Sequence, residues 1–172
     1  MPDGNSATRV ADYFRANPRA MTMVAARELS ISESQVMRNL PSDRVTELST
    51  ARFLEMMDRL AEYKSVHVIV SNGTTTIEAF GKFGNFSTYG PFFNVQTKSL
   101  DMHIRQDQID SVFAVEKPGH LDGVATLSIQ YYDRAGNSAF KVFLTFGNQA
   151  PSHDCRQWWE RFRDDFKISD DS

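Results

Sequence analysis

The spacing of apolar residues changes twice along the chain, and this change constrains the fold more than any other feature. The spacing is helical up to about residue 62, alternates with a period of two from Val66 to about residue 146, and is helical again over residues 153–167. Helices that flank a continuous run of strands are typical of α+β proteins. The sequence predicts one domain with a helical N-terminal module (1–62), an antiparallel sheet (63–148) and a closing helix (152–168).

Within the N-terminal module, residues 20–40 predict a helix-turn-helix. Ser32 and Gln35 have the spacing of a capping box, and Leu40-Pro41 prevents the second helix from continuing. Such a segment is one hypothesis for a DNA-binding regulator or sensor. The charge pattern argues against it, because the second helix has Arg38 as its one basic residue and phosphate contacts need several cations. We therefore expect no nucleic-acid partner.

The middle of the chain predicts about seven strands. Asn72-Gly73 indicates a hairpin, and the segment from Asp133 to Gly136 indicates a second turn. The expected strands are 64–71, 74–81, 91–97, 100–105, 109–117, 124–132 and 138–146. The closing helix is amphipathic, with Cys155 on its apolar face and Ser152 as its N-cap. At this position packing explains the cysteine better than nucleophilic chemistry does.

Composition removes several classes of protein. A single cysteine among 172 residues excludes an intrachain disulfide framework and a cysteine-rich zinc site. The phosphate-binding, nucleophile-elbow and zinc-protease motifs are missing, so an enzyme is not favoured. With no run of 18 apolar residues and no signal peptide, the expected location is the cytoplasm, without membrane insertion.

His103 is the most informative histidine. In the strand from Leu100 to Arg105, the side chains of Asp101, His103 and Arg105 share one face. An imidazole nitrogen can bind the iron of a porphyrin, and a guanidinium can bind its propionates. Aromatic residues could supply apolar contact to the macrocycle, or could instead fill a core or a subunit interface. These aromatic residues are Phe83, Phe86, Tyr89, Phe92, Phe93 and Phe143.

Several segments, taken in order, resemble the HutX/ChuX-type haem-utilisation carrier proteins, which are relatives of the single repeat of HemS-type haem-trafficking proteins. The segments are Val36-Met37-Arg38-Asn39-Leu40-Pro41, Ile77-Glu78-Ala79-Phe80-Gly81, Gly90-Pro91-Phe92-Phe93-Asn94-Val95, Met102-His103-Ile104, Ser111-Val112-Phe113-Ala114-Val115-Glu116-Lys117 and Asp133-Arg134-Ala135-Gly136 followed by Phe140-Lys141-Val142-Phe143-Leu144. The similarity spans roughly residues 10–167. It implies a cytoplasmic, usually dimeric protein that binds haem b non-covalently, and that receives, buffers or hands on haem to another protein.

The resemblance also implies roles for individual residues. His103 matches the axial iron ligand, whereas Ser71 occupies a position where some members have a second histidine. Serine is a poor iron ligand, so Tyr89 or His67 would have to replace it if a second ligand exists. Further expected haem contacts are the propionate partners Arg105 and Lys98 and the apolar side chains Phe93 and Phe143. The alternative to a carrier within this resemblance is a haem-degrading enzyme that depends on an external electron donor.

Overall fold

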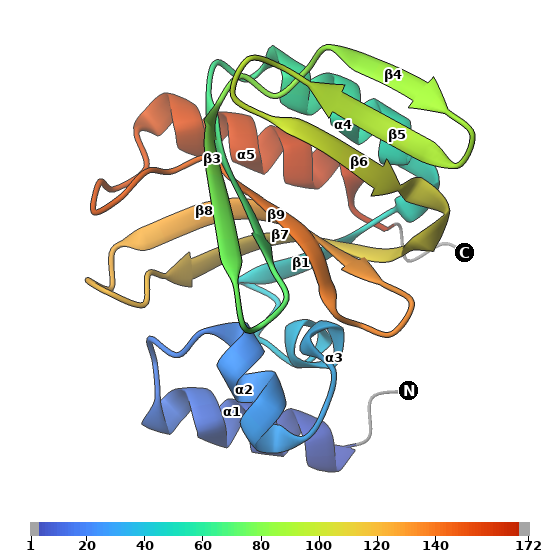
Figure 1. The fold of residues 1–172 in the computed structure, drawn as a ribbon. Coiled ribbons are helices and arrows are strands. Elements are labelled where there is room, and N and C mark those ends of the chain that lie inside the picture. The colour runs from blue at the N-terminus through green and yellow to red at the C-terminus, as the bar shows by residue number, and fades with distance from the viewer. Residues whose placement is uncertain (1–3, 169–172) are drawn as a thin grey trace.

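The computed structural model describes residues 4–168. Within this range the helices are α1 (Gly4–Ala16), α2 (Thr22–Leu29), α3 (Glu33–Arg38), α4 (Phe53–Glu62) and α5 (His153–Phe166). The strands are β1 (Val45–Leu48), β2 (Val66–Ser71), β3 (Thr76–Gly81), β4 (Phe86–Tyr89), β5 (Phe92–Gln96), β6 (Asp101–Arg105), β7 (Ile109–Pro118), β8 (Ala125–Asp133) and β9 (Ser138–Phe143). The predicted α+β class is confirmed, with helices at both ends of an antiparallel β region (Figure 1).

The strands form two antiparallel sheets. The large sheet has the order β1-β7-β8-β9-β2-β3, and the small sheet has the order β4-β5-β6. The structure therefore differs from the expectation of about seven strands, since it adds β1 and β4 and divides the strands between two sheets. Both added strands have four residues, which is too short to give a clear alternation pattern, and alternation does not reveal which strands pair.

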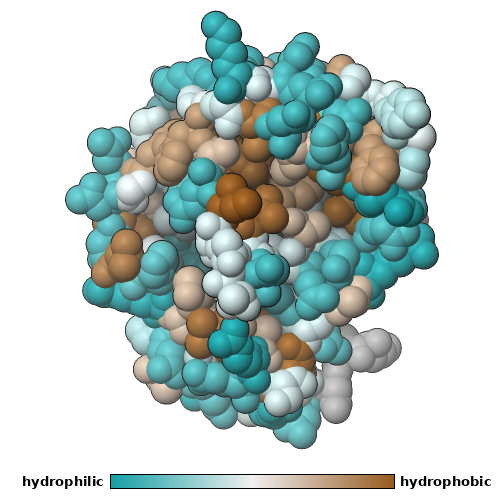
Figure 2. Space-filling model, in the orientation of Figure 1, coloured by the Kyte–Doolittle hydropathy of each residue, from teal (hydrophilic) through white to brown (hydrophobic). Residues whose placement is uncertain are grey.

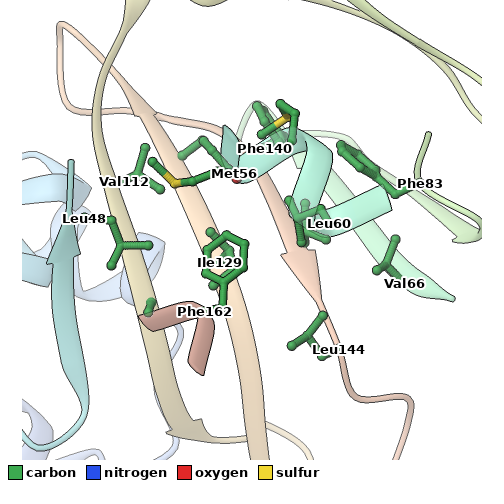
Figure 3. Packing of buried hydrophobic residues seen from close by; sticks show 14 of the residues in the cluster. Leu48, Met56, Leu60, Val66, Phe83, Val112, Ile129, Phe140, Leu144 and Phe162 are labelled. Carbon is green, nitrogen blue, oxygen red and sulfur yellow. The ribbon is translucent and has the colours of Figure 1, made fainter. Parts of the chain in front are cut away.

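One apolar core joins the two sheets to α4 and α5. Figure 3 shows side chains from both helices and from the large sheet meeting in this core, and buried residues of β5 and β6 belong to the same cluster. In α5 the buried side chains include Trp159, Phe162 and Cys155, so the prediction that the cysteine fills space is confirmed. Because the core faces of both sheets are covered, their polar residues lie on the opposite faces.

The local signals for turns and caps are also confirmed. Ser32 and Gln35 form the predicted capping box, and Ser152 accepts a hydrogen bond from the Cys155 amide at the start of α5. The hairpin at Asn72 is present, but its loop has four residues instead of two, because Ser71 pairs with Thr76. The Asn72 side chain accepts hydrogen bonds from the amides of residues 74 and 75, which stabilises the longer loop.

The N-terminal helices cover part of the outer face of the large sheet, as Figure 1 shows below β1 and β7. Apolar contact is part of this packing: Met37 of α3 contacts Phe113 and Tyr132. A buried ion pair is the other part. The Lys141 ammonium of β9 lies 2.6 Å from the Glu33 carboxylate, whose side chain is 6% exposed and also accepts a hydrogen bond from the Thr22 hydroxyl.

The buried ion pair gives a prediction about stability. Replacing Lys141→Met should lower the free energy of unfolding by about 3 kcal/mol, because it leaves the Glu33 carboxylate buried without a cation. The double variant Lys141→Met with Glu33→Gln should recover most of this loss. Urea denaturation of the three proteins measures it.

A matched control is available on the surface. Arg15 and Asp12 also form an ion pair, but their side chains are 75% and 59% exposed. Arg15→Met should therefore leave the unfolding midpoint unchanged. Equal losses of unfolding free energy in Lys141→Met and Arg15→Met would contradict the explanation that burial makes the Glu33–Lys141 pair important for stability.

Candidate functional site

His103 lies on the outer face of the small sheet. Ile104, the next residue in β6, and Phe93, which pairs with Ile104 in β5, point into the core. His103 and the residues that share its face therefore point away from the core. The outer face is formed by alternate residues of the three strands, namely Ser87, Tyr89, Phe92, Asn94, Gln96, Asp101, His103 and Arg105. The His103 side chain is 57% exposed, and the prediction from alternation that Asp101, His103 and Arg105 share this face is confirmed.

A hydrogen bond to Asn94 sets the tautomer of the neutral His103 ring. The Asn94 side-chain amide donates to the Ser87 hydroxyl at 3.1 Å, and its carbonyl oxygen lies 2.6 Å from His103 Nδ1. Because a carbonyl oxygen can only accept, Nδ1 carries the proton and donates it. In the neutral ring the lone pair is then on Nε2, which has Asp101 Oδ1 at 3.7 Å.

Asn94 is the residue of this arrangement that sequence reasoning did not single out. It lies between Phe93 and Val95 in β5, directly opposite His103, and is 7% exposed. A polar residue between two core residues of a strand is a signal in the sequence. Its partner could not be known, however, because the register between β5 and β6 is a tertiary property.

Tyr89, Phe92 and Arg105 form the next row across the same face. Tyr89 is opposite Phe92, and Phe92 is opposite Arg105. The Phe92 and His103 ring centroids are 6.5 Å apart, and the Arg105 guanidinium carbon lies 5.7 Å from the centre of the Phe92 ring. Tyr89 is 82% exposed. The structure thus brings Tyr89 and Arg105 onto the face that carries His103.

Arg105 already has an anionic partner. Its guanidinium makes two hydrogen bonds to the Asp107 carboxylate, at 2.8 and 2.9 Å. These bonds, together with one from Gln108, hold the pKa of the Asp107 carboxyl well below its usual range. A propionate would therefore have to share Arg105 with Asp107.

Two other expected haem contacts on this sheet lie elsewhere than the His103 face. Lys98 is exposed in the turn between β5 and β6. Phe93 is 5% exposed and packs edge-on against Phe53 of α4, with ring centroids 5.6 Å apart. Alternation places Phe93 and His103 on opposite faces once the strand register is known.

His67 and Phe143 lie on the outer face of the large sheet, beyond the core. His67 Nε2 is 3.0 Å from a Glu78 carboxylate oxygen, and its ring stacks on Phe80 with centroids 4.1 Å apart. Phe143 is opposite His67 in β9. Ser71 is at the end of β2 and accepts a hydrogen bond from the Thr76 hydroxyl. The structure therefore does not bring these residues together with His103.

A cavity of about 350 Å³ lies between α2, α3 and the outer face of the large sheet. Its wall includes the Glu33–Lys141 ion pair and Lys117 of β7. Partial burial, together with the positive charges of Lys141 and Arg44, lowers the pKa of the Lys117 ammonium to about 8. The cavity is thus a separate environment from the open face of the small sheet.

The second helix of the predicted helix-turn-helix, α3, is largely buried against the rest of the protein. In α3, the buried residues include Glu33, Val36 and Met37. Arg38 is paired with Glu47 at 2.7 Å and lies over the Phe113 ring. The one basic residue of this helix is therefore engaged within the protein.

Neither a membrane-spanning helix nor a cluster of metal ligands is present within residues 4–168. Across the described helices, no segment has the length and apolar character of a membrane span. In the same residues, no group of three or more His, Cys, Asp or Glu side chains is arranged to hold a metal ion.

The fold is that of an α+β protein with a histidine on the open face of a small antiparallel sheet. A family model described as the haemin-degrading HemS.ChuX domain matches residues 30–166. The chain belongs to this family, as the resemblance in its sequence implied.

Individual relatives are distant in sequence and similar in fold. The intracellular heme transport protein HutX of Vibrio cholerae is 20% identical over 138 residues, which are 79% of this chain and 70% of HutX. The structure of the heme-binding protein ChuX matches with a TM-score of 0.79 and 19% identity, covering 91% of this chain and 97% of ChuX. The heme-degrading enzyme ChuS of Escherichia coli O157:H7 matches with a TM-score of 0.79 and 20% identity, covering 98% of this chain and 48% of ChuS.

The half-buried Lys117 gives a prediction about pH. Between its folded pKa of about 8 and its ordinary value of 10.5, the unfolded chain binds more protons than the folded one at Lys117, so this group makes stability rise with pH. Lys117→Met should raise the free energy of unfolding at pH 7 by about 1–3 kcal/mol, because a partly desolvated charge is removed. This gap in unfolding free energy between Lys117→Met and the wild type should shrink as the pH rises and close by about pH 11. Urea denaturation at pH 7, 9 and 10.5 measures it, and a constant gap would disprove it.

Proposed function

We propose that this protein is an intracellular haem carrier, not an enzyme, and that it holds haem b non-covalently with His103 Nε2 as axial ligand to the iron. The observation that carries the proposal is the hydrogen bond from His103 Nδ1 to Asn94. It fixes the ring and leaves the lone pair on the exposed nitrogen, an arrangement common for metal-bound histidines. The family match and the names of HutX and ChuX support haem as the ligand.

The surroundings of His103 suit the flat apolar face of a porphyrin. Phe92 and Tyr89 lie on the same face, one row away along the strands, and supply ring surface. Of the two proposed cations, Lys98 is the better propionate partner, because no ion pair of Lys98 is found within residues 4–168 and Arg105 is bound to Asp107. Phe93 supports this surface from the core side without contacting haem.

The proposed second ligand is Tyr89, because it shares a face with His103. His67 and Ser71 lie on the outer face of the other sheet, so they cannot reach an iron bound to His103 of the same chain. His67 is moreover held by Glu78 and by the stack with Phe80. We assign His67 and Phe143 a structural role.

An open binding face suits transfer. His103 and Tyr89 are exposed, so haem held between these two ligands would keep the side that points away from the sheet accessible to another protein. A second copy of the chain, in a homodimer, or a haem-receiving protein would cover that side. This exposure favours a carrier that releases its haem over a site that encloses it.

The ligand assignment is tested by absorption titration of the purified protein with ferric haem. We expect a saturating Soret shift at one haem per chain. His103→Ala should abolish this shift, since it removes the iron ligand, whereas His67→Ala and the exposed control His153→Ala should bind as the wild type does. Tyr89→Phe should retain binding with an altered ferric spectrum. Unchanged binding by His103→Ala, or no saturable shift in the wild type, would refute the proposal.

The role of Asn94 is tested separately. Asn94→Ala removes the acceptor of the Nδ1 proton and should weaken haem affinity by about 10–100-fold. Asn94→Asp keeps an acceptor oxygen and should restore most of the affinity. If Asn94→Ala binds haem as tightly as Asn94→Asp and the wild type do, Asn94 has no part in orienting the His103 ring.

Carrier and degrading enzyme are distinguished by adding a reductant to the haem-loaded protein under air. A carrier should lose its Soret band slowly and without a defined product. Rapid conversion to one open-chain tetrapyrrole would establish the enzyme instead.

A further inference from the structure

The outer face of the small sheet carries a chain of four hydrogen bonds that connects a carboxylate to His103. The Gln96 side-chain amide donates to Asp101 Oδ1 at 3.4 Å, and the Ser87 hydroxyl donates to Gln96 Oε1 at 3.2 Å. The Asn94 side-chain amide donates to the Ser87 hydroxyl at 3.1 Å, and His103 Nδ1 lies 2.6 Å from Asn94 Oδ1. The register of β4, β5 and β6 brings these residues together.

The carboxylate at one end can order the whole chain. An amide side chain keeps its shape when its NH2 group and its oxygen exchange places, and a hydroxyl can donate in either direction. An ionised carboxylate can only accept, so Gln96 must present its NH2 group to Asp101. The Gln96 oxygen then faces Ser87, whose hydroxyl must donate to it. Asp101 therefore sets the direction of the first two hydrogen bonds.

The same order continues to the imidazole. Because the Ser87 proton points to Gln96, the Ser87 oxygen is left to accept, and the Asn94 NH2 group donates to it. The Asn94 oxygen is then turned to His103, and Nδ1 must carry the ring proton. In a chain of the opposite direction, Asn94 would present its NH2 group to the ring. The proton of the neutral ring would then be on Nε2, where it would block a bond to iron.

Asp101 does not hold the ring proton on Nε2 by direct contact. Its Oδ1 atom lies 3.7 Å from His103 Nε2, beyond hydrogen-bond distance, whereas Gln96 donates a hydrogen bond to the same oxygen. Asn94, in the middle of the chain, is 7% exposed, so water has little access to its side chain. The carboxylate therefore acts on the ring through the intervening side chains.

We propose that Asp101, Gln96 and Ser87 are positioning residues. Through Asn94 they fix the tautomer of His103, with the proton on Nδ1 and the lone pair on Nε2. This tautomer is a property of the protein without haem. Its use, which is to offer Nε2 to iron, rests on the proposed function.

NMR of the haem-free, nitrogen-labelled full chain tests this proposal, because the chemical shifts of Nδ1 and Nε2 report which nitrogen carries the proton. The spectra are recorded at about pH 9, where an ordinary histidine is neutral, and His103→Ala identifies the signals. The wild type should show the proton on Nδ1. In Asp101→Asn the two shifts should move toward each other, because an amide can donate as well as accept and both tautomers become populated.

A matched control and a rescue variant separate this role from a merely structural one. Asp43→Asn makes the same change at an exposed carboxylate outside the chain and should leave the His103 shifts unchanged. In the double variant Asp101→Asn with Gln96→Glu, the new carboxylate can only accept from the Ser87 hydroxyl, so the wild-type shifts should return. Ser87→Ala breaks the chain and should give mixed tautomers.

The two proposals fail in different ways. Unchanged shifts in Asp101→Asn, or altered shifts that Gln96→Glu does not restore, overturn the positioning role whether or not haem binds. If the shifts follow the chain but the wild type binds no haem, the positioning role stands and the carrier proposal falls. If haem binds, Asp101→Asn should bind it roughly twofold more weakly when half of its His103 rings carry the proton on Nε2. The double variant should then recover the wild-type affinity.

Discussion

The apolar core shared by the two sheets determines where every chemically useful side chain can lie. Val68, Val142 and Ile129 of the large sheet meet Phe93 and Ile104 of the small sheet, together with α4 and α5. Successive residues of a strand point to opposite faces, so filling the inner faces with apolar groups sends the polar ones outward. His67 and His103 consequently lie on the outer faces of two different sheets.

The two outer faces differ because one of them is covered. The N-terminal helices pack on the large sheet, where Lys117 and the Glu33–Lys141 pair are largely withdrawn from water. There a charge without a partner is costly, which is why the pKa of Lys117 is lowered. Within residues 4–168 no helix covers the outer face of the small sheet in this way, and His103 and Tyr89 are exposed there. Figure 2 shows mostly hydrophilic residues on the face it draws, with hydrophobic residues near its centre where β2 and β3 cross the molecule.

Much of the candidate site followed from local pattern, and the remainder required strand pairing. Alternation within β6 was enough to place Arg105 beside His103 on one face. It could not relate that face to β5, so Phe93 was expected to contact haem although it lies in the core, and Asn94 was overlooked although it orients the histidine. Alternation within β6 also could not show that the Arg105 guanidinium donates hydrogen bonds to the Asp107 carboxylate.

By itself the sequence determined the type and order of most elements, because helical and strand periodicity, the capping box at Ser32 and the N-cap at Ser152 are local properties of the chain. It also determined, through alternation, that His103 is not a core residue. Tertiary structure alone decided that the strands form two sheets, that α3 encloses a cavity over the large sheet, and that Lys117 is left there without a carboxylate. The physical reason is that register, burial and charge pairing depend on contacts between residues far apart in the chain, which a local pattern does not contain.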